Sequence, residues 1–288
     1  MTQFSTPLRY PGGKGKLTEF LKLVISENHL LGCEYVEPYA GGAGIALNLL
    51  LHGYAARIHL NDLNSSVFAF WQSVIDQPDE LCKLIRDTPV TMEEWHRQKA
   101  VQSNQANHSQ IDLGFSTFFL NRTNRSGIIW AGVIGGKNQD GEWKLDARFN
   151  KDDLISRVER IALFRANISL YNLDAATLIT TVVPTLPRKT LVYLDPPYYV
   201  KGKGLYENHY SHDDHSQIAR LVATRLKRPW VVSYDHVPEI VGMYPRFTSI
   251  VYGLNYSAQM RYQGAEVMFF SDRLAVPDVD NPTKLKAA

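Results

Sequence analysis

Cysteine is scarce in this sequence, with only Cys33 and Cys82 among 288 residues. Two thiols are too few for a disulfide framework or for a zinc site built on cysteine. No uninterrupted apolar run reaches the roughly 18 residues that a membrane-spanning helix needs. The first residues, MTQFSTPLRYPGGK, also lack the apolar core of a secretion signal. We therefore expect a cytoplasmic protein without a membrane partner.

A strong excess of charge of one sign is absent as well. The formal net charge is only +2 at pH 7, so the composition neither demands nor excludes a nucleic-acid partner. Hydrophobic residues make up 44% and charged residues 21% of the chain, as is typical of soluble globular proteins. A chain of this length can bury a core as one large domain or as one domain with an insertion.

Short apolar runs that end in polar or acidic residues alternate with helical patterns along the chain. The expected strands, in chain order, are about 34–38, ARIHLNDLN, ANISLYNLD, TLVYLDPPY, PWVVSYDH, FTSIVYGLN and EVMFFSDR, with the last two antiparallel. Strands that alternate with helices predict an α/β fold, in which helices cover both faces of a mostly parallel sheet.

The segment 68–164 interrupts this alternation. It is rich in Gln, Asn, Arg and aromatic residues, and its pattern is mostly helical, with a β-hairpin expected at the Asp140-Gly141 turn. We therefore expect this segment to be an insertion into a discontinuous α/β domain formed by 1–67 and 165–274. The short polar tail, 275–288, is expected to be disordered.

A glycine-rich loop, EPYAGGAG at 37–44, lies between the first expected strand and the helix GIALNLLLH, which Gly53 ends. Such a loop lets the backbone approach a ligand closely near a helix N-terminus. It lacks both the GxGxxG spacing of dinucleotide-binding loops and the Gly-Lys-Ser/Thr ending of a phosphate loop. A tight structural turn is the alternative interpretation.

Asp62 ends the next expected strand, about twenty residues after the glycine loop, which is the spacing of an acid that binds ribose hydroxyls. Together, the loop and the acid favour a cofactor that contains a nucleoside. The alternative is that Asp62 caps the helix that starts in Asp-Leu-Asn-Ser.

The N-terminal stretch LRYPGGKGKL contains a rigid turn, Tyr10 and Lys14. Lys14 could neutralise a carboxylate or a phosphate, and Tyr10 could pack on a flat ring. The alternative is a basic arm that contacts only solvent or DNA.

The stretch LVYLDPPYYV runs from an apolar strand directly into Asp195, Pro196, Pro197 and Tyr198. The two prolines remove two backbone donors and fix two φ angles. The Asp195 carboxylate and the Pro196 carbonyl can then accept both hydrogens of adenine's amino group, which favours a pyramidal, nucleophilic nitrogen. Stacking on Tyr198, worth roughly 1–3 kcal/mol, would help offset the cost of flipping a base out of a duplex. A strand-ending turn is the alternative.

In this order, LRYPGGK, VEPYAGGAG, LNDLN and DPPY resemble the motifs of the Dam-type DNA adenine methyltransferases in their alpha arrangement. FFLNRTNRSG (118–127) is similar to the segment that carries the family's Leu-Asn-Arg signature, and the resemblance covers about 7–273. It implies a Rossmann-like S-adenosylmethionine-dependent methyltransferase sheet, into which a mostly helical target-recognition subdomain with a β-hairpin is inserted. It also implies transfer of a methyl group from S-adenosylmethionine to the exocyclic amino nitrogen of a flipped adenine in duplex DNA.

The resemblance assigns catalysis to Asp195, Pro196, Pro197 and Tyr198. It assigns cofactor binding to the motif residues Tyr10, Lys14, Glu37, Pro38, Tyr39, Gly41, Gly42, Gly44, Asp62, Asp174 and Asp195. Tyr10 stands where a tryptophan is common in the family, and this substitution keeps a flat ring. The reaction needs no metal, and His209, His212 and His215, although three residues apart, belong to a segment in which Ser211 and Asp214 form a capping box.

A basic, glycine-rich region follows the Leu-Asn-Arg segment and is expected to enter a DNA groove. Arginine side chains suit phosphates or guanine edges, and Asn121, Asn124 and Gln139 could read adenines. The expected DNA-binding residues are Asn121, Arg122, Asn124, Arg125, Lys137, Asn138 and Lys144. A solvated surface hairpin is the alternative.

The stretch SGIIWAGVIGGKNQDGEWKLDARF departs from the GATC-methylating enzymes, which leaves the recognition sequence open. Oligomeric state and pairing with a restriction nuclease are open as well. The rival functions are methylation of RNA or of a protein glutamine, where the related motif usually begins with Asn, and DNA binding without turnover.

Overall fold

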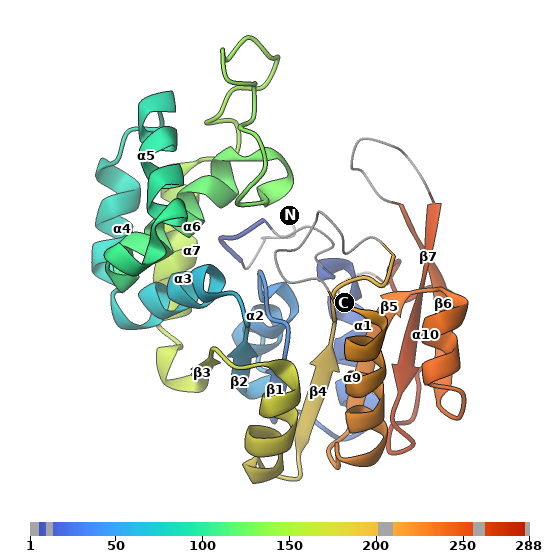
Figure 1. Ribbon diagram of the computed structural model, residues 1–288. Helices are drawn as coiled ribbons and strands as arrows, with labels where there is room; N and C mark the ends of the chain where they lie inside the picture. Colours follow the sequence, from blue (N-terminus) through green and yellow to red (C-terminus); the bar gives the residue numbers. More distant parts are fainter. Residues whose placement is uncertain (1–5, 10–13, 201–209, 256–262, 286–288) are drawn as a thin grey trace. The chain divides into compact units, whose positions relative to one another are not determined.

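The computed structural model describes residues 6–9, 14–200, 210–255 and 263–285 (Figure 1). The chain divides into two compact units. The first, here called the helical unit, consists of Met1–Gly13 and Asn64–Leu170; the second, the sheet unit, consists of Lys14–Leu63 and Tyr171–Ala288. The division into a catalytic domain and a target-recognition insertion at the boundaries given above stays a prediction.

A seven-stranded sheet has the order β3-β2-β1-β4-β5-β7-β6. Its strands are β1 (Cys33–Glu37), β2 (Ala55–Asn61), β3 (Ile168–Tyr171), β4 (Thr190–Leu194), β5 (Trp230–Asp235), β6 (Thr248–Asn255) and β7 (Gln263–Phe270). β1 pairs in parallel with β2 and β4, and β4 pairs in parallel with β5. β7 is antiparallel to both β5 and β6. The expected α/β fold with two antiparallel late strands is confirmed.

Helices follow most strands of the sheet unit. They are α1 (Thr18–Glu27), α2 (Gly44–Leu51), α8 (Ala175–Thr177), α9 (His212–Thr224) and α10 (Pro238–Met243), with a 3-10 turn at Gly15–Leu17, a π turn at Leu178–Val182 and a 3-10 turn at Val183–Thr185. Gly53 has φ 76° just beyond the end of α2, as the sequence predicts. Ser211 and Asp214 form the predicted capping box at the start of α9.

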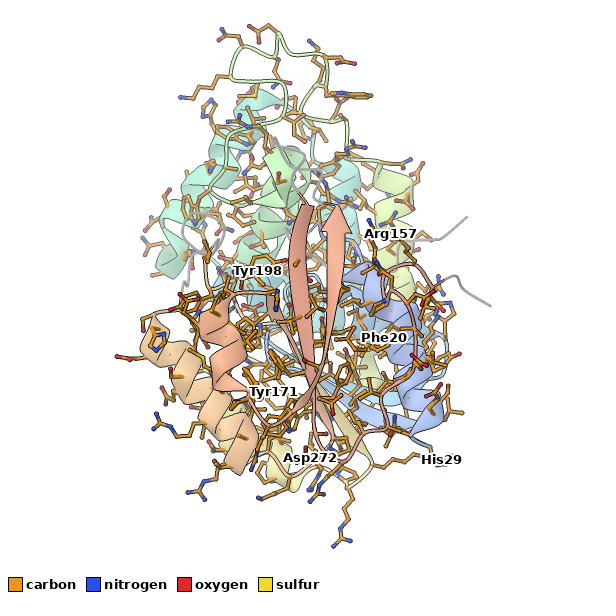
Figure 2. The ribbon with its side chains drawn as sticks, turned by 90° about the vertical axis from the view of Figure 1, so that its right-hand side faces the viewer. Phe20, His29, Arg157, Tyr171, Tyr198 and Asp272 are labelled. Atoms are coloured by element: carbon orange, nitrogen blue, oxygen red, sulfur yellow. The ribbon has the colours of Figure 1, made fainter. Side chains whose placement is uncertain are left out.

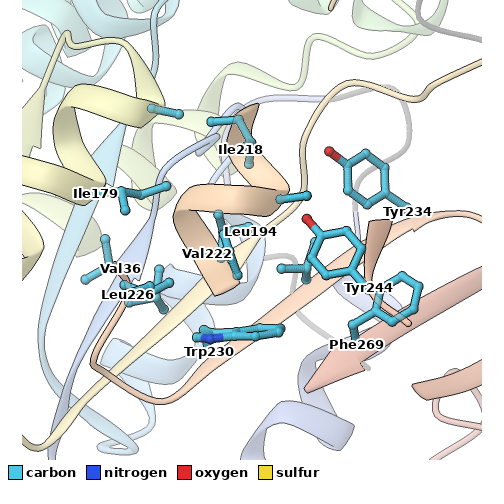
Figure 3. Close-up of a cluster of buried hydrophobic side chains, with 14 of the residues drawn as sticks. Val36, Ile179, Leu194, Ile218, Val222, Leu226, Trp230, Tyr234, Tyr244 and Phe269 are labelled. Carbon is cyan, nitrogen blue, oxygen red and sulfur yellow. The ribbon is translucent and has the colours of Figure 1, made fainter. Parts of the chain in front are cut away.

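Both faces of the sheet are covered by helices. Neighbouring residues of a strand point to opposite faces. In β7, Phe269 joins the cluster that contains α9 and α10 residues, whereas Phe270 packs edge-on against Phe20. Figure 2 labels Phe20 on α1. The α9 side is a continuous apolar layer, in which Ile218 and Val222 belong to the same buried cluster as Leu194 (Figure 3). This packing holds the ends of β4 and β5 rigid.

The helical unit contains the mostly helical segment that the sequence predicts. Its helices are α3 (Ser65–Asp76), α4 (Pro78–Asp87), α5 (Met92–Ser103), α6 (Gln110–Thr123) and α7 (Lys151–Ala162), with 3-10 turns at Gln105–Asn107, Arg125–Gly127 and Arg165–Asn167. Asn64 caps α3 by accepting from the backbone N–H groups of Ser66 and Val67. A capping box of Ser109 and Asp112 starts α6.

The β-hairpin expected at Asp140-Gly141 does not form. Over 121–148, all of which the structure describes, no strand is present, and the pairing is one isolated bridge between Asn124 and Val133. The Gln139 side chain explains this difference, because it bonds to the backbone of Ile134, Gly136 and Leu145 and folds the segment into successive turns.

The C-terminal tail contains neither helix nor strand over 275–285, and 286–288 lie outside the described residues. Its first residue is held by the side chain of Asn28, which donates to the Ala275 carbonyl at 2.8 Å and accepts from the Ala275 N–H at 2.7 Å. Disorder of the tail as a whole stays a prediction.

Candidate functional site

The order of the strands brings two of the motifs together. β1 and β4 are neighbours, and the chain continues from β1 to β2 on one side and from β4 to β5 on the other. In open α/β sheets, ligands bind at such a point, beyond the carboxyl ends of the two strands. The glycine loop follows β1, and the Asp-Pro-Pro-Tyr segment follows β4. Topology therefore places both motifs at the edge where a ligand is expected.

The glycine loop is tightly turned and is fixed to the end of β2. Gly41 (φ 46°) and Ala43 (φ 48°) both have left-handed backbone conformations. The Gly41 N–H donates to Asp62 Oδ2 at 2.9 Å. Asn61 donates through its side chain to the Pro38 carbonyl at 2.8 Å. Asp62 therefore orients the loop, while Asn64 caps the next helix, so the cap interpretation of Asp62 is wrong. Its binding to ribose stays a prediction.

Two side chains of the loop are buried against neighbouring elements. Glu37, 5% exposed, accepts from the Ala46 N–H in the first turn of α2 at 3.1 Å. Burial raises the pKa of Glu37 from 4.5 to about 8. The half-buried Tyr39 shares a hydrogen bond of 3.1 Å with the hydroxyl of Tyr210. These two contacts attach the loop to α2 and to the segment before α9.

The other expected cofactor residues differ in their surroundings. Asp174 is exposed and caps the short helix α8, with Oδ1 accepting from the Ala176 N–H at 2.8 Å. Gly42 is buried and Gly44 is half-buried at the start of α2. Tyr10 lies outside the described residues. Cofactor binding by each of them stays a prediction.

At the end of β4, Asp195 has one oxygen occupied and one available. Its Oδ1 accepts from the Ser233 hydroxyl at 2.8 Å and lies 3.1 Å from Lys14 Nζ. Within the described parts of the chain, neither its Oδ2 nor the carbonyl of Pro196 has a hydrogen-bond partner. The Asp195 side chain is 25% exposed. Two adjacent acceptors at the end of β4 therefore have no partner among the described residues, and they match a ligand with two N–H donors.

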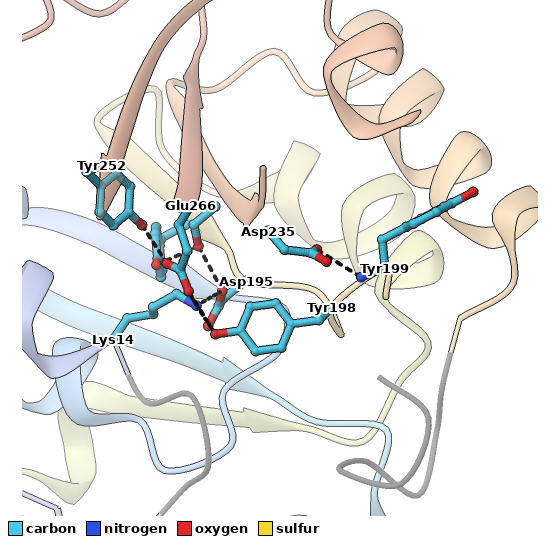
Figure 4. A network of polar contacts seen from close by, with 9 residues as sticks. Lys14, Asp195, Tyr198, Tyr199, Asp235, Tyr252 and Glu266 are labelled. Atoms are coloured by element: carbon cyan, nitrogen blue, oxygen red, sulfur yellow. Dashed lines mark hydrogen bonds and ion pairs between the residues drawn. The ribbon is translucent and has the colours of Figure 1, made fainter. Parts of the chain in front are cut away.

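Lys14 is a buried cation of this site. It is 7% exposed, and its Nζ contacts Asp195, Glu266 at 3.3 Å and the Tyr198 hydroxyl at 3.0 Å (Figure 4). Burial by itself would lower the pKa of Lys14, but the facing charge of Asp195, followed by Tyr198 and Glu266, raises that pKa well above its ordinary value. Lys14 therefore neutralises carboxylates, one of the two roles that the sequence offers; a contact with the cofactor stays a prediction.

Tyr198 is anchored inside the protein. It is 5% exposed; its hydroxyl donates to Glu266 Oε1 at 2.8 Å, and Lys14 Nζ lies 4.7 Å from its ring centre. Pro196 is buried and Pro197 is half-buried. Stacking of a base on Tyr198 stays a prediction and requires its ring to become accessible.

Sequence reasoning missed the residues that support these groups from β5, β6 and β7. Glu266 accepts from Tyr198, Lys14 and the Tyr252 hydroxyl, the last at 2.9 Å. Asp235 accepts from the N–H of Tyr199 at 2.9 Å and of Val200 at 3.1 Å (Figure 4). A carboxylate within the apolar strand EVMFF, and one directly after PWVVSY, were the available signals.

In the helical unit, two of the asparagines expected to bind DNA, Asn121 and Asn124, are bonded to the protein's own backbone. Asn121 Oδ1 accepts from the Arg9 N–H at 2.7 Å, and its amide donates to the carbonyls of Arg9 and Gly127. Asn124 accepts from the Trp95 indole and donates to the carbonyls of two residues in the next turn. Reading a base would require these bonds to break, so that role stays a prediction.

The basic residues of the helical unit are in two environments. Arg122 is 7% exposed, and burial, with neighbouring Arg157 and Arg9, lowers its pKa to about 9. The remaining expected DNA-binding residues, Arg125, Lys137, Asn138 and Lys144, are exposed. They are therefore accessible to a polyanion, although DNA contact by any of them is untested.

Two further properties concern the described residues alone. None of the helices placed in the structure is long and apolar enough to cross a membrane. In the same parts of the chain, no three His, Cys, Asp or Glu side chains are grouped as metal ligands.

Comparison with known proteins identifies the family. No curated protein matches the chain significantly. Among solved structures, protein LPL1258 from Legionella pneumophila matches with a TM-score of 0.32 and 10% identity, over 91% of this chain and 86% of that chain, a likeness too low to inform fold or function. The model of the D12 class N6 adenine-specific DNA methyltransferases matches residues 10–257. The chain therefore belongs to the D12 class of N6 adenine-specific DNA methyltransferases.

Proposed function

We propose that this protein transfers a methyl group from S-adenosylmethionine to the exocyclic amino nitrogen of a flipped adenine at a specific site in duplex DNA. The family supports DNA adenine methylation. The observation that carries the finer proposal is a pair of acceptors at the end of β4, Asp195 Oδ2 and the Pro196 carbonyl, which have no hydrogen-bond partner in the part of the chain that the structure describes. An adenine amino group has two N–H donors, which match these two acceptors.

The two acceptors prepare the nitrogen for attack. Adenine's amino lone pair is delocalised into the ring, and two hydrogen bonds favour a pyramidal nitrogen that holds the pair locally. When bound, S-adenosylmethionine supplies a sulfonium-activated methyl group. The new N–C bond forms as the C–S bond breaks, and the amino nitrogen then releases one proton. Because Ser233 and Lys14 fix Asp195 beforehand, little reorganisation is needed during the reaction.

The cofactor would lie beyond β1, where the residues present suit a nucleoside with a charged tail. The tight glycine loop leads directly into α2, and Asp62 holds the Gly41 N–H at the end of β2. A carboxylate at this place suits ribose hydroxyls. This assignment requires Asp62 to bind the cofactor while it retains its bond to the loop.

DNA would contact the exposed basic residues of the helical unit. Arg125, Lys137 and Lys144 project from the turns that follow α6, and the buried Arg122 forms no ion pair with a carboxylate in the described parts of the chain. Arginine and lysine at such positions suit backbone phosphates, which position a duplex without reading its sequence. A cytoplasmic location and a cognate restriction nuclease remain part of the proposal.

The test is to express the chain in a host whose DNA lacks methyladenine and to sequence that DNA by a single-molecule method that detects the modification. N6-methyladenine at one motif is expected. Asp195→Ala should abolish it, because one of the two acceptors is lost, and Asp272→Asn, at an exposed position, should preserve it.

Two outcomes would contradict the proposed reaction, and a third would contradict the role of Asp195. Methyl transfer to RNA or to a protein glutamine, with none to DNA, would assign the same site to another substrate. Binding of S-adenosylmethionine and DNA without transfer would leave a non-catalytic relative. Normal activity of Asp195→Ala would remove the role assigned to that carboxylate.

A further inference from the structure

Arg122 is a buried guanidinium for which the described residues offer no partner. The residue lies in the last turn of α6 and is 7% exposed. Its Nε atom is enclosed, and the guanidinium forms neither a hydrogen bond nor an ion pair with any other residue that the structure describes. Nearly all buried polar groups in folded proteins are hydrogen-bonded, and an isolated buried charge is costly. The arrangement therefore indicates that a ligand supplies the missing acceptors.

The charges around Arg122 belong mainly to other arginines. The pKa of Arg122 is lowered to about 9, first by burial and then by three neighbouring charges, those of Arg157, Arg9 and Arg148. Arg148 also acts on Arg9, whose pKa is lowered mainly by burial. Asp153 acts on Arg122 in the opposite direction, but its carboxylate is bound to Arg157, with Nη2 2.6 Å from Oδ2. An anion from outside the protein would therefore meet several guanidinium groups at once.

Bonds within the helical unit hold these arginines near one another. Asn121, the residue before Arg122, accepts from the Arg9 N–H at 2.7 Å and donates to the Arg9 carbonyl at 2.6 Å. Arg157 Nη1 donates to the Thr6 carbonyl at 2.9 Å, which attaches the same N-terminal segment to α7. The N-terminal segment, α6 and α7 are therefore joined beside the buried guanidinium, so a ligand would meet a site that is already assembled.

We infer that Arg122, with Arg9, Arg148 and Arg157 around it, binds one phosphate group of the backbone of duplex DNA. A guanidinium presents its N–H donors in a planar fork that fits pairs of phosphate oxygens. The several oxygens of a phosphate also allow more than one guanidinium to bind the same group. The choice of DNA as the source of the phosphate rests on the proposed function, but the phosphate site itself does not.

A phosphate bound at this place would fix the duplex on the helical unit without reading its sequence. Phosphate contacts set the register and orientation of a DNA-binding protein, whereas base contacts set its specificity. Arg122 belongs to a helix, so the position of this contact is defined by α6 and not by the exposed turns that follow it. Loss of Arg122 should therefore weaken binding to all duplexes alike.

The first experiment measures thermal unfolding of the full chain without cofactor or DNA. Inorganic phosphate is the probe, compared with sodium chloride at equal ionic strength, and the variant is Arg122→Met. Because phosphate stabilises folded proteins in general, the comparison between proteins decides. We expect phosphate to raise the Tm of wild type by at least about 2 °C more than that of Arg122→Met.

The matched control is Arg86→Met, which removes the same charge from an exposed position on α4. It should respond to phosphate as wild type does. In chloride, Arg122→Met should be at least as stable as wild type, because it removes a buried charge that has no partner. Equal phosphate responses of wild type and Arg122→Met would overturn the inference. Strong destabilisation of Arg122→Met in chloride would overturn it as well, because the guanidinium would then be satisfied within the protein.

The second experiment measures the affinity of unmethylated duplexes of different sequence over a range of salt concentrations. Arg122→Met should bind every duplex on the order of tenfold more weakly, and the slope of log affinity against log salt should be lower by about 0.9. Arg148→Ala, which removes an exposed member of the cluster, should lower the affinity less. Unchanged DNA affinity and slope in Arg122→Met, together with a lost phosphate response, would assign the site to free phosphate and overturn DNA as the source.

The inference and the proposed function fail separately. If wild-type protein methylates DNA, while Arg122→Met responds to phosphate and binds DNA as wild type does, only the inference is refuted. If wild-type protein methylates no DNA, the proposed function is refuted, and the thermal response to inorganic phosphate still decides whether Arg122 belongs to a phosphate site.

Discussion

Individual residues of the site differ in how much of their bonding capacity the fold uses. Asp195 Oδ1 is bound by Ser233 and Lys14, while Oδ2 has no hydrogen-bond partner among the residues that the structure places. Glu266, by contrast, is buried completely and accepts from three donors. The two carboxylates therefore differ in their surroundings, although both are bound to the same lysine; in the proposed function, Asp195 is the one that contacts the adenine.

A residue-scale prediction concerns Glu37. Its pKa in the folded protein is about 8 instead of 4.5 because it is buried, so between these values the unfolded chain releases a proton that the folded chain keeps. Folding stability must therefore fall as pH rises through this range. Glu37→Gln keeps an acceptor for the Ala46 N–H but has no proton to release. As the pH rises from about 5 to about 8, the free energy of unfolding of Glu37→Gln should therefore increase relative to that of wild type by roughly 1–3 kcal/mol.

Urea denaturation at each pH, without cofactor, measures this gain. Glu27→Gln, at an exposed position on α1, is the matched control and should follow the wild-type pH dependence. Parallel pH profiles for wild type and Glu37→Gln would show that Glu37 ionises normally in the folded protein.

Among the elements, β5 supports the segment that follows β4. The supporting group is the side chain of Asp235, the last residue of β5. Asp235 binds the N–H groups of Tyr199 and Val200, and these follow directly on the Asp-Pro-Pro-Tyr segment. The prolines fix the first part of that segment through their own φ angles. The two bonds to Asp235 fix its far end, so the segment is held from both sides.

An element-scale prediction follows for Asp235. Asp235→Ala removes both bonds and should slow single-turnover methyl transfer on the order of tenfold, because small misplacements of reacting groups are costly. Asp235→Asn keeps one acceptor oxygen, so its rate of methyl transfer should fall less than that of Asp235→Ala. S-adenosylmethionine affinity, measured by calorimetry, should change little in either variant. Equal rates for both variants and wild type would mean that the prolines alone hold the segment.

At the scale of the whole molecule, the charge is nearly balanced, at +2, so DNA affinity must depend on local basic groups. Arg125→Ala combined with Lys137→Ala removes two exposed charges from the turns after α6. Each lost phosphate contact reduces the slope of log affinity against log salt by about 0.9. We expect weaker DNA binding and a slope lower by about 1–2, with cofactor affinity unchanged.

The matched control is Lys83→Ala combined with Arg86→Ala, which removes the same charges from exposed positions on α4. This control should leave the DNA affinity and the salt dependence of that affinity closer to the wild-type values than Arg125→Ala with Lys137→Ala does. Equal losses in the two double variants would indicate that only net charge matters, and that the turns after α6 are not a specific contact surface.

The sequence by itself determined the elements and the motifs that end them. Strand periodicity placed all the strands of the sheet, and strand ends marked Asp62 and Asp195, because alternation and turn chemistry are local properties of the chain. The same local reasoning failed for the hairpin at Asp140-Gly141, where the side chain of Gln139 binds backbone groups on both sides and favours turns over strand pairing.

Only the tertiary structure decided the partners of those residues. Lys14 and Glu266 are separated by most of the sequence, and they meet because β7 inserts between β5 and β6 in a register that sets Glu266 opposite Tyr252 and Asp235. Asn121 likewise meets Arg9 across a long stretch of chain. Electrostatic and hydrogen-bond energies depend on distances in space, and sequence spacing does not encode those distances once a strand enters the sheet out of order.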